Sequence, residues 1–214
     1  MKKSILTLVA VVLLSVLGYS SNNNFDSEMK ENLKQVRAMS EKTNYKDLGD
    51  KFATISKDNA KRFEPLYYSA YCYILHSWQL QDAKEKTAIL TLAKTQIDKA
   101  NKLMPNNDEI MVLEAFYYQA LIVVNPQQNG QLYSGKASML LSKAQAINKN
   151  NPRAQFLLAQ NVYYRPVQYG GGKDKALPLF KKAEKLYSKQ KSDNYLSPLW
   201  GQHTNGEMIK ACKK

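Results

Sequence analysis

Small apolar residues recur along the chain at one fixed spacing. An alanine, a bulky apolar residue and a second alanine follow one another at steps of four and three, and a proline or polar residue stands five positions later: Ala93, Ile97, Ala100 and Pro105; Ala137, Leu141, Ala144 and Lys149; Ala176, Phe180, Ala183 and Ser188. Steps of four and three place side chains on one face of an α-helix. Alanines on that face let a second helix approach closely, so the pattern predicts tightly packed helices.

Another helical segment precedes each of these three. A small residue lies in its middle and a larger side chain follows three positions later, in the pairs Ala70 and Tyr73, Ala115 and Tyr118, and Ala159 and Val162. Asn151 before Pro152 is typical of a helix start, because an asparagine caps free backbone amides and proline fits the first helical position. Asn107 before Asp108 indicates another start. The chain is therefore predicted to form consecutive helix pairs.

This arrangement resembles the tetratricopeptide-repeat superfamily over residues 64–188. The resemblance implies an all-α fold, in which tetratricopeptide-like antiparallel helix pairs stack into a right-handed superhelix. Ala70, Ala115 and Ala159 lie 45 and 44 residues apart, whereas the standard repeat has about 34. We therefore expect lengthened turns inside the pairs, over segments 79–88, 125–134 and 165–173.

One helical-repeat domain is expected over residues 21–214. Each repeat leaves an apolar face that a neighbour must cover, so we expect caps at both ends of the array. In the first cap, Leu33, Val36 and Met39 are expected to point inward. The predicted parts are a degenerate capping pair at 26–62, repeats at 64–105, 108–149 and 152–188, and a C-terminal cap at 195–214 that includes a short helix after Trp200.

The first residues have the pattern of a cleavable signal peptide. Two lysines follow Met1, and an apolar stretch runs from Ile5 to Leu17. That stretch is shorter than the roughly 20 residues that span a bilayer. No cysteine follows it as a lipid acceptor. We expect a signal peptide at 1–20, a periplasmic or secreted protein, and no stable membrane insertion after cleavage.

The chain is basic, with 31 Lys and Arg residues against 18 Asp and Glu residues and a formal charge of +13. The basic residues are spread over many segments and form no dense run, which argues against a nucleic-acid partner. For an exported protein, an anionic surface, a glycan or an acidic protein is the expected attraction.

Three further pieces resemble small exported repeat proteins of Bacteroidetes-type bacteria. They are the segment that begins at Pro65, the tripeptide Asn151-Pro152-Arg153, and the glycine segment 170–172 with the lysines after it. The closing Pro198-Leu-Trp-Gly fits the same group. The glycine segment is also similar to periplasmic helical-repeat subunits of tripartite transporters.

Gly170, Gly171 and Gly172 stand just before a predicted helix. Three amides at a helix start can hold an anion. The segment lacks the lysine–serine/threonine ending of a nucleotide-binding loop, and glycines are also what a sharp turn requires. The turn is the favoured interpretation, and anion binding is left open.

The inner face of the superhelix is predicted to bind a partner. If the first helix of each pair lines that face, aromatic and amide side chains gather on it. Tyrosine suits recognition because it buries a large area and keeps a polar end. The predicted partner-binding residues are Tyr67, Tyr71, Phe116, Gln119, Phe156, Gln160, Tyr163 and Tyr164.

Catalytic and metal-ligating patterns are not found in the sequence. His76 and His203 lie far apart and have no ligand neighbours at helical spacing, and no nucleophile motif is present. Cys72 and Cys212 are the two cysteines; Cys72 is expected to be a small buried side chain, and a disulfide between them is left open.

We expect a non-enzymatic scaffold that binds a protein or peptide and needs no cofactor or metal. The alternative is a periplasmic small-ligand-binding accessory subunit of a transporter. The sequence does not give the oligomeric state.

Overall fold

The computed structural model of the chain describes residues 24–38, 40, 42–192 and 194–214. The expected signal peptide and Met39 lie outside the described residues. All regular structure within them is helical. A helix over residues 24–38 is followed by α2 (Tyr45–Asp58), α3 (Glu64–Gln79), α4 (Ala83–Leu103), α5 (Asp108–Val124), α6 (Pro126–Ile147), α7 (Pro152–Tyr164), the short 3-10 helix η1 (Val167–Tyr169), α8 (Lys173–Tyr187) and α9 (Gln202–Lys213).

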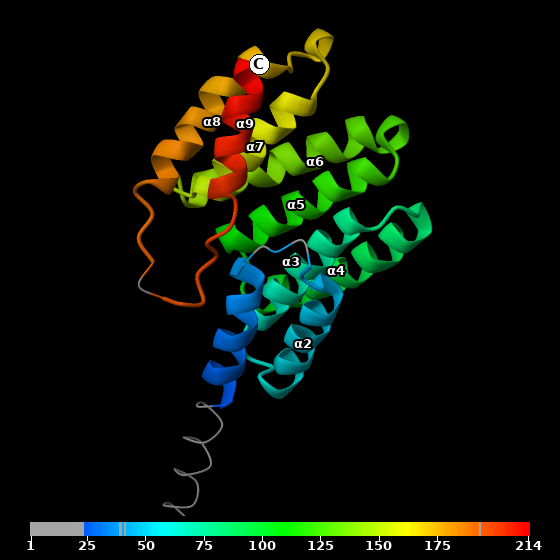
Figure 1. Cartoon of the computed structure of the whole chain (residues 1–214), viewed down its shortest axis with the longest axis vertical. Coiled ribbons are helices and arrows are strands. Elements are labelled where there is room, and N and C mark those ends of the chain that lie inside the picture. Colours follow the sequence, from blue (N-terminus) through cyan, green and yellow to red (C-terminus); the bar gives the residue numbers. More distant parts are fainter. Residues whose placement is uncertain (1–23, 39, 41, 193) are drawn as a thin grey trace, which may run out of the picture.

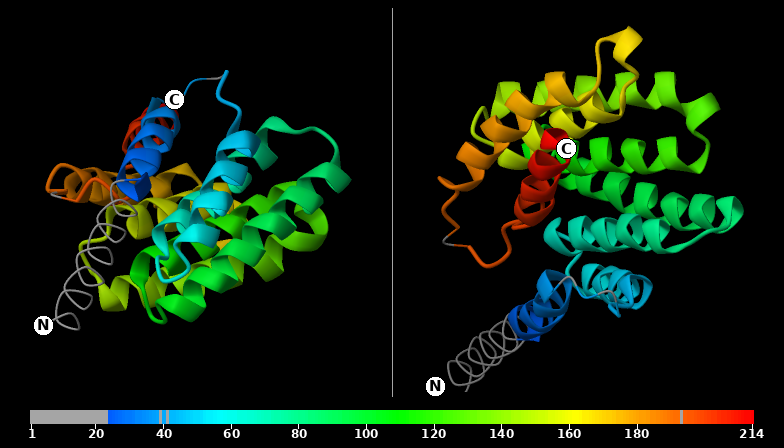
Figure 2. Two further views of the ribbon diagram at one scale, coloured as in Figure 1. Left: turned by 90° about the horizontal axis from the view of Figure 1, so that it is seen from below. Right: turned by 45° about the horizontal axis from the view of Figure 1, so that its top comes forward.

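The helices pair in chain order and the pairs stack on one another. α3 packs on α4, α5 on α6, and α7 on α8, while α5 also packs on both helices of the preceding pair. Figure 2 shows this succession from α2 to α8. The helix over residues 24–38 lies at one end of the stack, and α9 packs against α8 at the other (Figure 1). The sequential stacking is that of a superhelix, not of a closed bundle.

The alanine faces predicted from the sequence form the contacts between helices. The alanines of this face on α4, α6 and α8 are fully buried, and so are the bulky residues between them: Ala93, Ile97, Ala100, Ala137, Leu141, Ala144, Ala176, Phe180 and Ala183. In the first helix, Leu33 and Val36 are buried as predicted. Helix faces with such small side chains allow the backbones of neighbouring helices to approach closely.

Both predicted helix starts are confirmed by side-chain caps. The Asn107 side chain accepts a hydrogen bond from the backbone amide of Ile110 at 3.1 Å, and Asn151 accepts one from Ala154 at 3.0 Å. Each cap satisfies an amide that has no partner within its own helix.

The prediction of lengthened turns is wrong for two of the three pairs. Only residues 80–82 connect α3 to α4, and Asn125 alone connects α5 to α6. The additional residues form helix instead, so α4 and α6 have 21 and 22 residues against 16 and 17 in their partners. Asp82 and Asn125 cap the next helix immediately after the preceding one has ended. A long loop is present only in the third pair.

That loop, residues 165–172, is closed by glycines. Gly170 and Gly172 have φ angles of 78° and 98°, in the left-handed region that side chains disfavour. A Cβ on Gly171 would lie 2.0 Å from the carbonyl oxygen of Arg165. The glycine segment is therefore required by the turn, as the sequence favoured.

We predict that the substitution Ala93→Leu destabilises the protein by about 1–3 kcal/mol, because the larger side chain overpacks a close helix contact. Ala88→Leu is the matched control, since Ala88 is exposed on the same helix and its change is expected to cost less than about 0.5 kcal/mol. Urea unfolding followed by circular dichroism measures both. Equal effects of the two substitutions would contradict the packing described here.

Candidate functional site

The segment between α8 and α9 crosses the inner face of the superhelix. We call its last part, Tyr195–Gly201, the C-terminal strap. Hydrogen bonds hold it to three helices: the backbone carbonyl of Leu196 accepts from the Tyr68 hydroxyl at 2.8 Å, and that of Trp200 accepts from the Tyr187 hydroxyl at 3.2 Å. The Tyr195 hydroxyl donates to Asp26 at 2.5 Å, and Arg37 donates to the Tyr195 carbonyl. The strap thereby joins both ends of the array.

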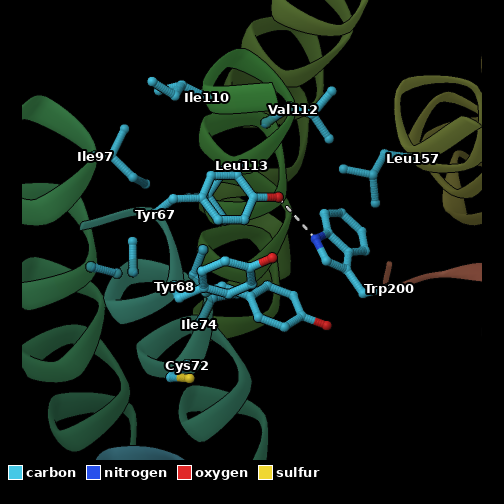
Figure 3. Packing of buried hydrophobic residues seen from close by; sticks show 14 of the residues in the cluster. Tyr67, Tyr68, Cys72, Ile74, Ile97, Ile110, Val112, Leu113, Leu157 and Trp200 are labelled. Atoms are coloured by element: carbon cyan, nitrogen blue, oxygen red, sulfur yellow. Dashed lines mark hydrogen bonds between the residues drawn. The ribbon is translucent and has the colours of Figure 1, made fainter. Parts of the chain in front are cut away.

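Trp200 anchors the strap among aromatic rings of the inner helices. Its indole nitrogen donates to the Tyr67 hydroxyl at 2.9 Å, as the dashed line in Figure 3 shows. The indole stacks on Tyr71, with ring centroids 5.2 Å apart, and on Phe116, 5.4 Å apart, and the Tyr71 and Phe116 rings also adjoin each other at 6.2 Å. Phe116 in turn stacks on Trp78 at 6.2 Å and an interplanar angle of 17°. Tyr71, Trp200, Phe116 and Trp78 form what we call the aromatic row.

Arg153, from the Asn151-Pro152-Arg153 segment, connects the strap to the helix starts. The buried guanidinium bonds both carboxylate oxygens of Glu109, at 2.8 and 2.5 Å. It also donates to Gln190 at 3.2 Å, and Gln190 donates to the Pro198 carbonyl. Burial lowers the pKa of Arg153, but the bonds to Glu109 and its charge raise it by more, so the group stays charged. Arg153 thus helps to position the strap through Gln190.

The inner face is covered near the starts of α3, α5 and α7 and uncovered near their ends. On α3, Tyr67 and Tyr71 are 1% and 3% exposed, whereas Trp78 is 48% exposed. On α7, Phe156 is 3% exposed and Tyr164 is 71% exposed. The strap thus covers one half of the face. We call the uncovered half the open inner surface: Trp78, Phe116, Val123, Gln160 and Tyr164.

The predicted partner-binding residues fall into three groups. Tyr67, Tyr71 and Phe156 are buried beneath the strap and present no surface to a partner in this conformation. Gln119 and Tyr163 are half-buried in contacts between helices: the Gln119 amide donates to the Leu157 carbonyl at 2.9 Å, and the Tyr163 ring packs on Phe180. Phe116 and Gln160 are half-buried and Tyr164 is exposed, and helical spacing assigns them to the open inner surface.

Trp78 and Val123 belong to that surface but were not predicted. Trp78 follows Tyr71 by seven residues, which places both on one face of α3. Val123 follows Phe116 by the same interval on α5. Helical spacing therefore contained the signal for both. The strap gave no such signal, because its position depends on contacts with residues more than a hundred positions away.

The remaining polar groups form no comparable site. A cavity of about 350 Å³ lies between the helix over residues 24–38 and α2, lined by side chains that include Glu28, Asp50 and Asp58. It shares no residue with the open inner surface. His76 bonds Gln79, and His203 is exposed on α9. Within the described residues, no three His, Cys, Asp or Glu side chains are grouped as metal ligands, and Cys72 and Cys212 are free thiols.

We predict that Trp200→Ala lowers the free energy of unfolding by about 3–5 kcal/mol, since it removes a buried ring that packs against Tyr71 and Phe116 and leaves a cavity there. Trp200→Phe keeps a ring but leaves the Tyr67 hydroxyl without its donor, so about 1–3 kcal/mol is expected. Chemical unfolding measures both. Leu199→Ala is the control, because Leu199 is a 47% exposed neighbour in the strap; a loss as large as that of Trp200→Ala would contradict the anchor.

Alkaline pH is predicted to unfold the protein cooperatively. Burial raises the pKa of Tyr67 and Tyr71 well above their ordinary value of 10.0. The folded state thus binds protons that the unfolded state releases, so this contribution to stability is complete below about pH 10 and is lost as the pH rises further. Tyrosinate absorbance should rise together with the loss of helical circular dichroism. Tyr67→Phe should make stability above pH 10 less steeply pH-dependent; an unchanged slope would count against the assignment.

Comparisons with known proteins place the chain in a family. No family profile and no curated protein sequence matches it. A solved structure, the HusA haemophore from Porphyromonas gingivalis, superposes with a TM-score of 0.79 and 31% sequence identity, over 88% of this chain and 92% of that one. A thermophilic TPR protein of Thermus thermophilus superposes with a TM-score of 0.60 over 93% of this chain, at 17% identity.

The second structure confirms the fold class, tetratricopeptide-like helix pairs stacked into a right-handed superhelix. The first also bears out the resemblance to exported repeat proteins of Bacteroidetes-type bacteria. The match to HusA, at 31% identity, extends over 92% of that chain, and the chain therefore belongs to the family of the HusA haemophore.

Proposed function

We propose that this protein binds haem, or a planar macrocycle of the same class, on the open inner surface and outside the cytoplasm. The membership in the family of a haemophore supports the ligand class. The signal-peptide pattern of residues 1–20 supports the location. The function proposed is binding, not catalysis.

The observation that carries the proposal is the end of the aromatic row. Trp200, Phe116 and Trp78 stack with interplanar angles of 24° and 17°, and the row ends at a 48% exposed indole. An exposed indole that adjoins other apolar side chains is typical of a binding surface. A flat macrocycle placed on Trp78 would continue the stack and cover apolar area that now faces water.

Further side chains of the surface suit the other parts of a haem. Tyr164 is 71% exposed and carries a phenolic oxygen, which is a known protein ligand of haem iron. Arg165 follows it and can approach a propionate carboxylate, and the positive charge of the whole chain attracts an anionic ligand. Val123 and the half-buried Gln160 complete a surface that is mostly apolar with a few polar groups, as small-molecule sites are.

Binding of a protein or peptide at the same surface is the second candidate. The observation that favours it is the strap itself, a non-helical segment that lies on the inner face through backbone carbonyl and side-chain contacts. An external peptide would have to use the other half of that face. The alternative expected from the sequence, a periplasmic small-ligand-binding accessory subunit of a transporter, agrees with the haem proposal in its class of ligand, and its association with a transporter stays a hypothesis.

Haem titration followed by absorbance in the Soret region tests the proposal. We expect saturable binding by the chain from residue 21 onward, and about tenfold weaker binding for Trp78→Ala, which corresponds to about 1.4 kcal/mol. Leu92→Ala is the matched control, because Leu92 is a 41% exposed side chain on the outer helix α4. Tyr164→Phe should shift the Soret band but leave the binding of iron-free protoporphyrin unchanged.

The outcomes separate the two candidates. No saturable change with wild-type protein, or equal affinity of Trp78→Ala and wild type, would overturn the haem proposal. A partner from envelope extracts that binds wild type but not Trp78→Ala, in a preparation that does not bind haem, would instead support peptide or protein binding.

A further inference from the structure

The positive charge of the chain is concentrated at its C-terminal end. Residues 173–214 contain ten lysines and four acidic residues, whereas residues 24–172 have 19 basic and 14 acidic residues. All ten lysines are exposed. Among the ion pairs of the described residues, Lys210 is the one of these lysines that takes part, with Glu207. The C-terminal part of the chain, with α8 and α9, therefore carries a strongly basic surface.

An exposed apolar turn lies beside this basic face. Val167 and Tyr169 are 78% and 70% exposed, and with Tyr164 they are the most exposed large hydrophobic side chains of the described residues. We call Val167 and Tyr169 the apolar tip. Hydrogen bonds fix the turn that carries them: the Gly170 amide donates to the Val167 carbonyl at 2.9 Å, and the Gly172 amide donates to Val162 at 3.0 Å. A hydrogen-bonded turn thus carries the exposed Val167 and Tyr169 side chains.

The start of α8 and the end of α9 lie next to the apolar tip. Lys173 and Lys175 lie in the first turn of α8, directly after the glycines. α9 packs against α8 and runs back toward the start of that helix, so the end of α9 that carries Lys210 and Lys213 lies at the same end of the molecule as Lys173. Figure 1 shows the C-terminus and the loop at the same end of the molecule. Lysines from both helices therefore flank the tip: Lys173, Lys175, Lys210, Lys213 and Lys214.

We propose that this end of the protein is a contact surface for an anionic phospholipid bilayer. Lysines attract the negative headgroups, and their long apolar stems allow the charge to stay at the headgroup level. Tyrosine is favoured at the boundary between water and lipid, where its ring is buried and its hydroxyl stays wet, and Val167 adds apolar area.

The combination distinguishes a bilayer from other anionic partners. An acidic protein or a polyanion would require the lysines alone, whereas a bilayer also provides an apolar layer for the tip. No helix among the described residues is long and apolar enough to cross a membrane; the contact proposed is peripheral. It is independent of the haem proposal, since Val167, Tyr169 and the five lysines are outside the open inner surface.

Vesicle sedimentation tests this surface. The chain from residue 21 onward, which contains all the core residues described above, is mixed with vesicles of phosphatidylglycerol and phosphatidylcholine or of phosphatidylcholine alone. Wild type should sediment with the anionic vesicles and be released by salt. The double substitution Val167→Ser with Tyr169→Ser, and the triple substitution Lys173→Gln, Lys213→Gln and Lys214→Gln, should each weaken binding at least about fivefold.

The control carries the same loss of charge at the other end of the array. Lys34, Lys57 and Lys61 are exposed, and their change to glutamine should leave vesicle binding within about twofold of wild type. Melting curves and haem titration show whether each variant is folded. If wild type does not sediment, or if both lysine triples weaken binding equally, the surface is wrong. If the tip substitutions have no effect while the Lys173 triple does, the partner is a polyanion or acidic protein, and the bilayer proposal is overturned.

Discussion

The stacking and hydrogen bonding of Trp200 on the inner helices determine which half of the inner face is covered and which half stays exposed. Tyr67 is fully buried, and its hydroxyl has a partner because the indole lies 2.9 Å away, from a residue 133 positions later. A buried hydroxyl without a partner is costly, so the strap and the inner face require each other. The Arg153–Glu109 pair adds a second constraint, since a buried guanidinium is tolerated only when its bonds are satisfied. Together these contacts close half of the face and leave the other half free for a ligand.

Much of the fold could be predicted because its determinants are local. The alanine steps of four and three define the packing faces of α4, α6 and α8, and Asn107 and Asn151 cap the helices that they were expected to cap. The prediction of lengthened turns was wrong for two pairs because the spacing between repeats fixes only the number of residues between corresponding positions, and not their conformation. Whether those residues form a loop or extend the next helix depends on the position of the next N-cap residue. Asp82 and Asn125 lie close to the end of the preceding helix, so the residues after them are helical.

The candidate site was less predictable, for a physical reason. Helical spacing assigns Tyr67, Tyr71 and Trp78 to one face of α3, yet their exposures differ from 1% to 48%. The difference comes from a distant segment that covers the first two and not the third. Likewise, the sequence places ten lysines in residues 173–214, but only the contact of α8 with α9 brings the end of one helix beside the start of the other (Figure 1). Local pattern gives the orientation of a side chain, whereas its accessibility is a property of the assembled chain.

Proteins built from helix pairs are ordinarily modular, because each unit contacts only its neighbours and further units can be added by duplication. The strap removes that freedom here. It bonds to Asp26 in the first described helix, to Tyr68 in the first repeat and to Tyr187 in the last, and so links points that lie on either side of three helix pairs. Insertion of a fourth pair would separate these attachment points. The array is thus fixed in length, and its ends are coupled so that neither can fray independently of the other.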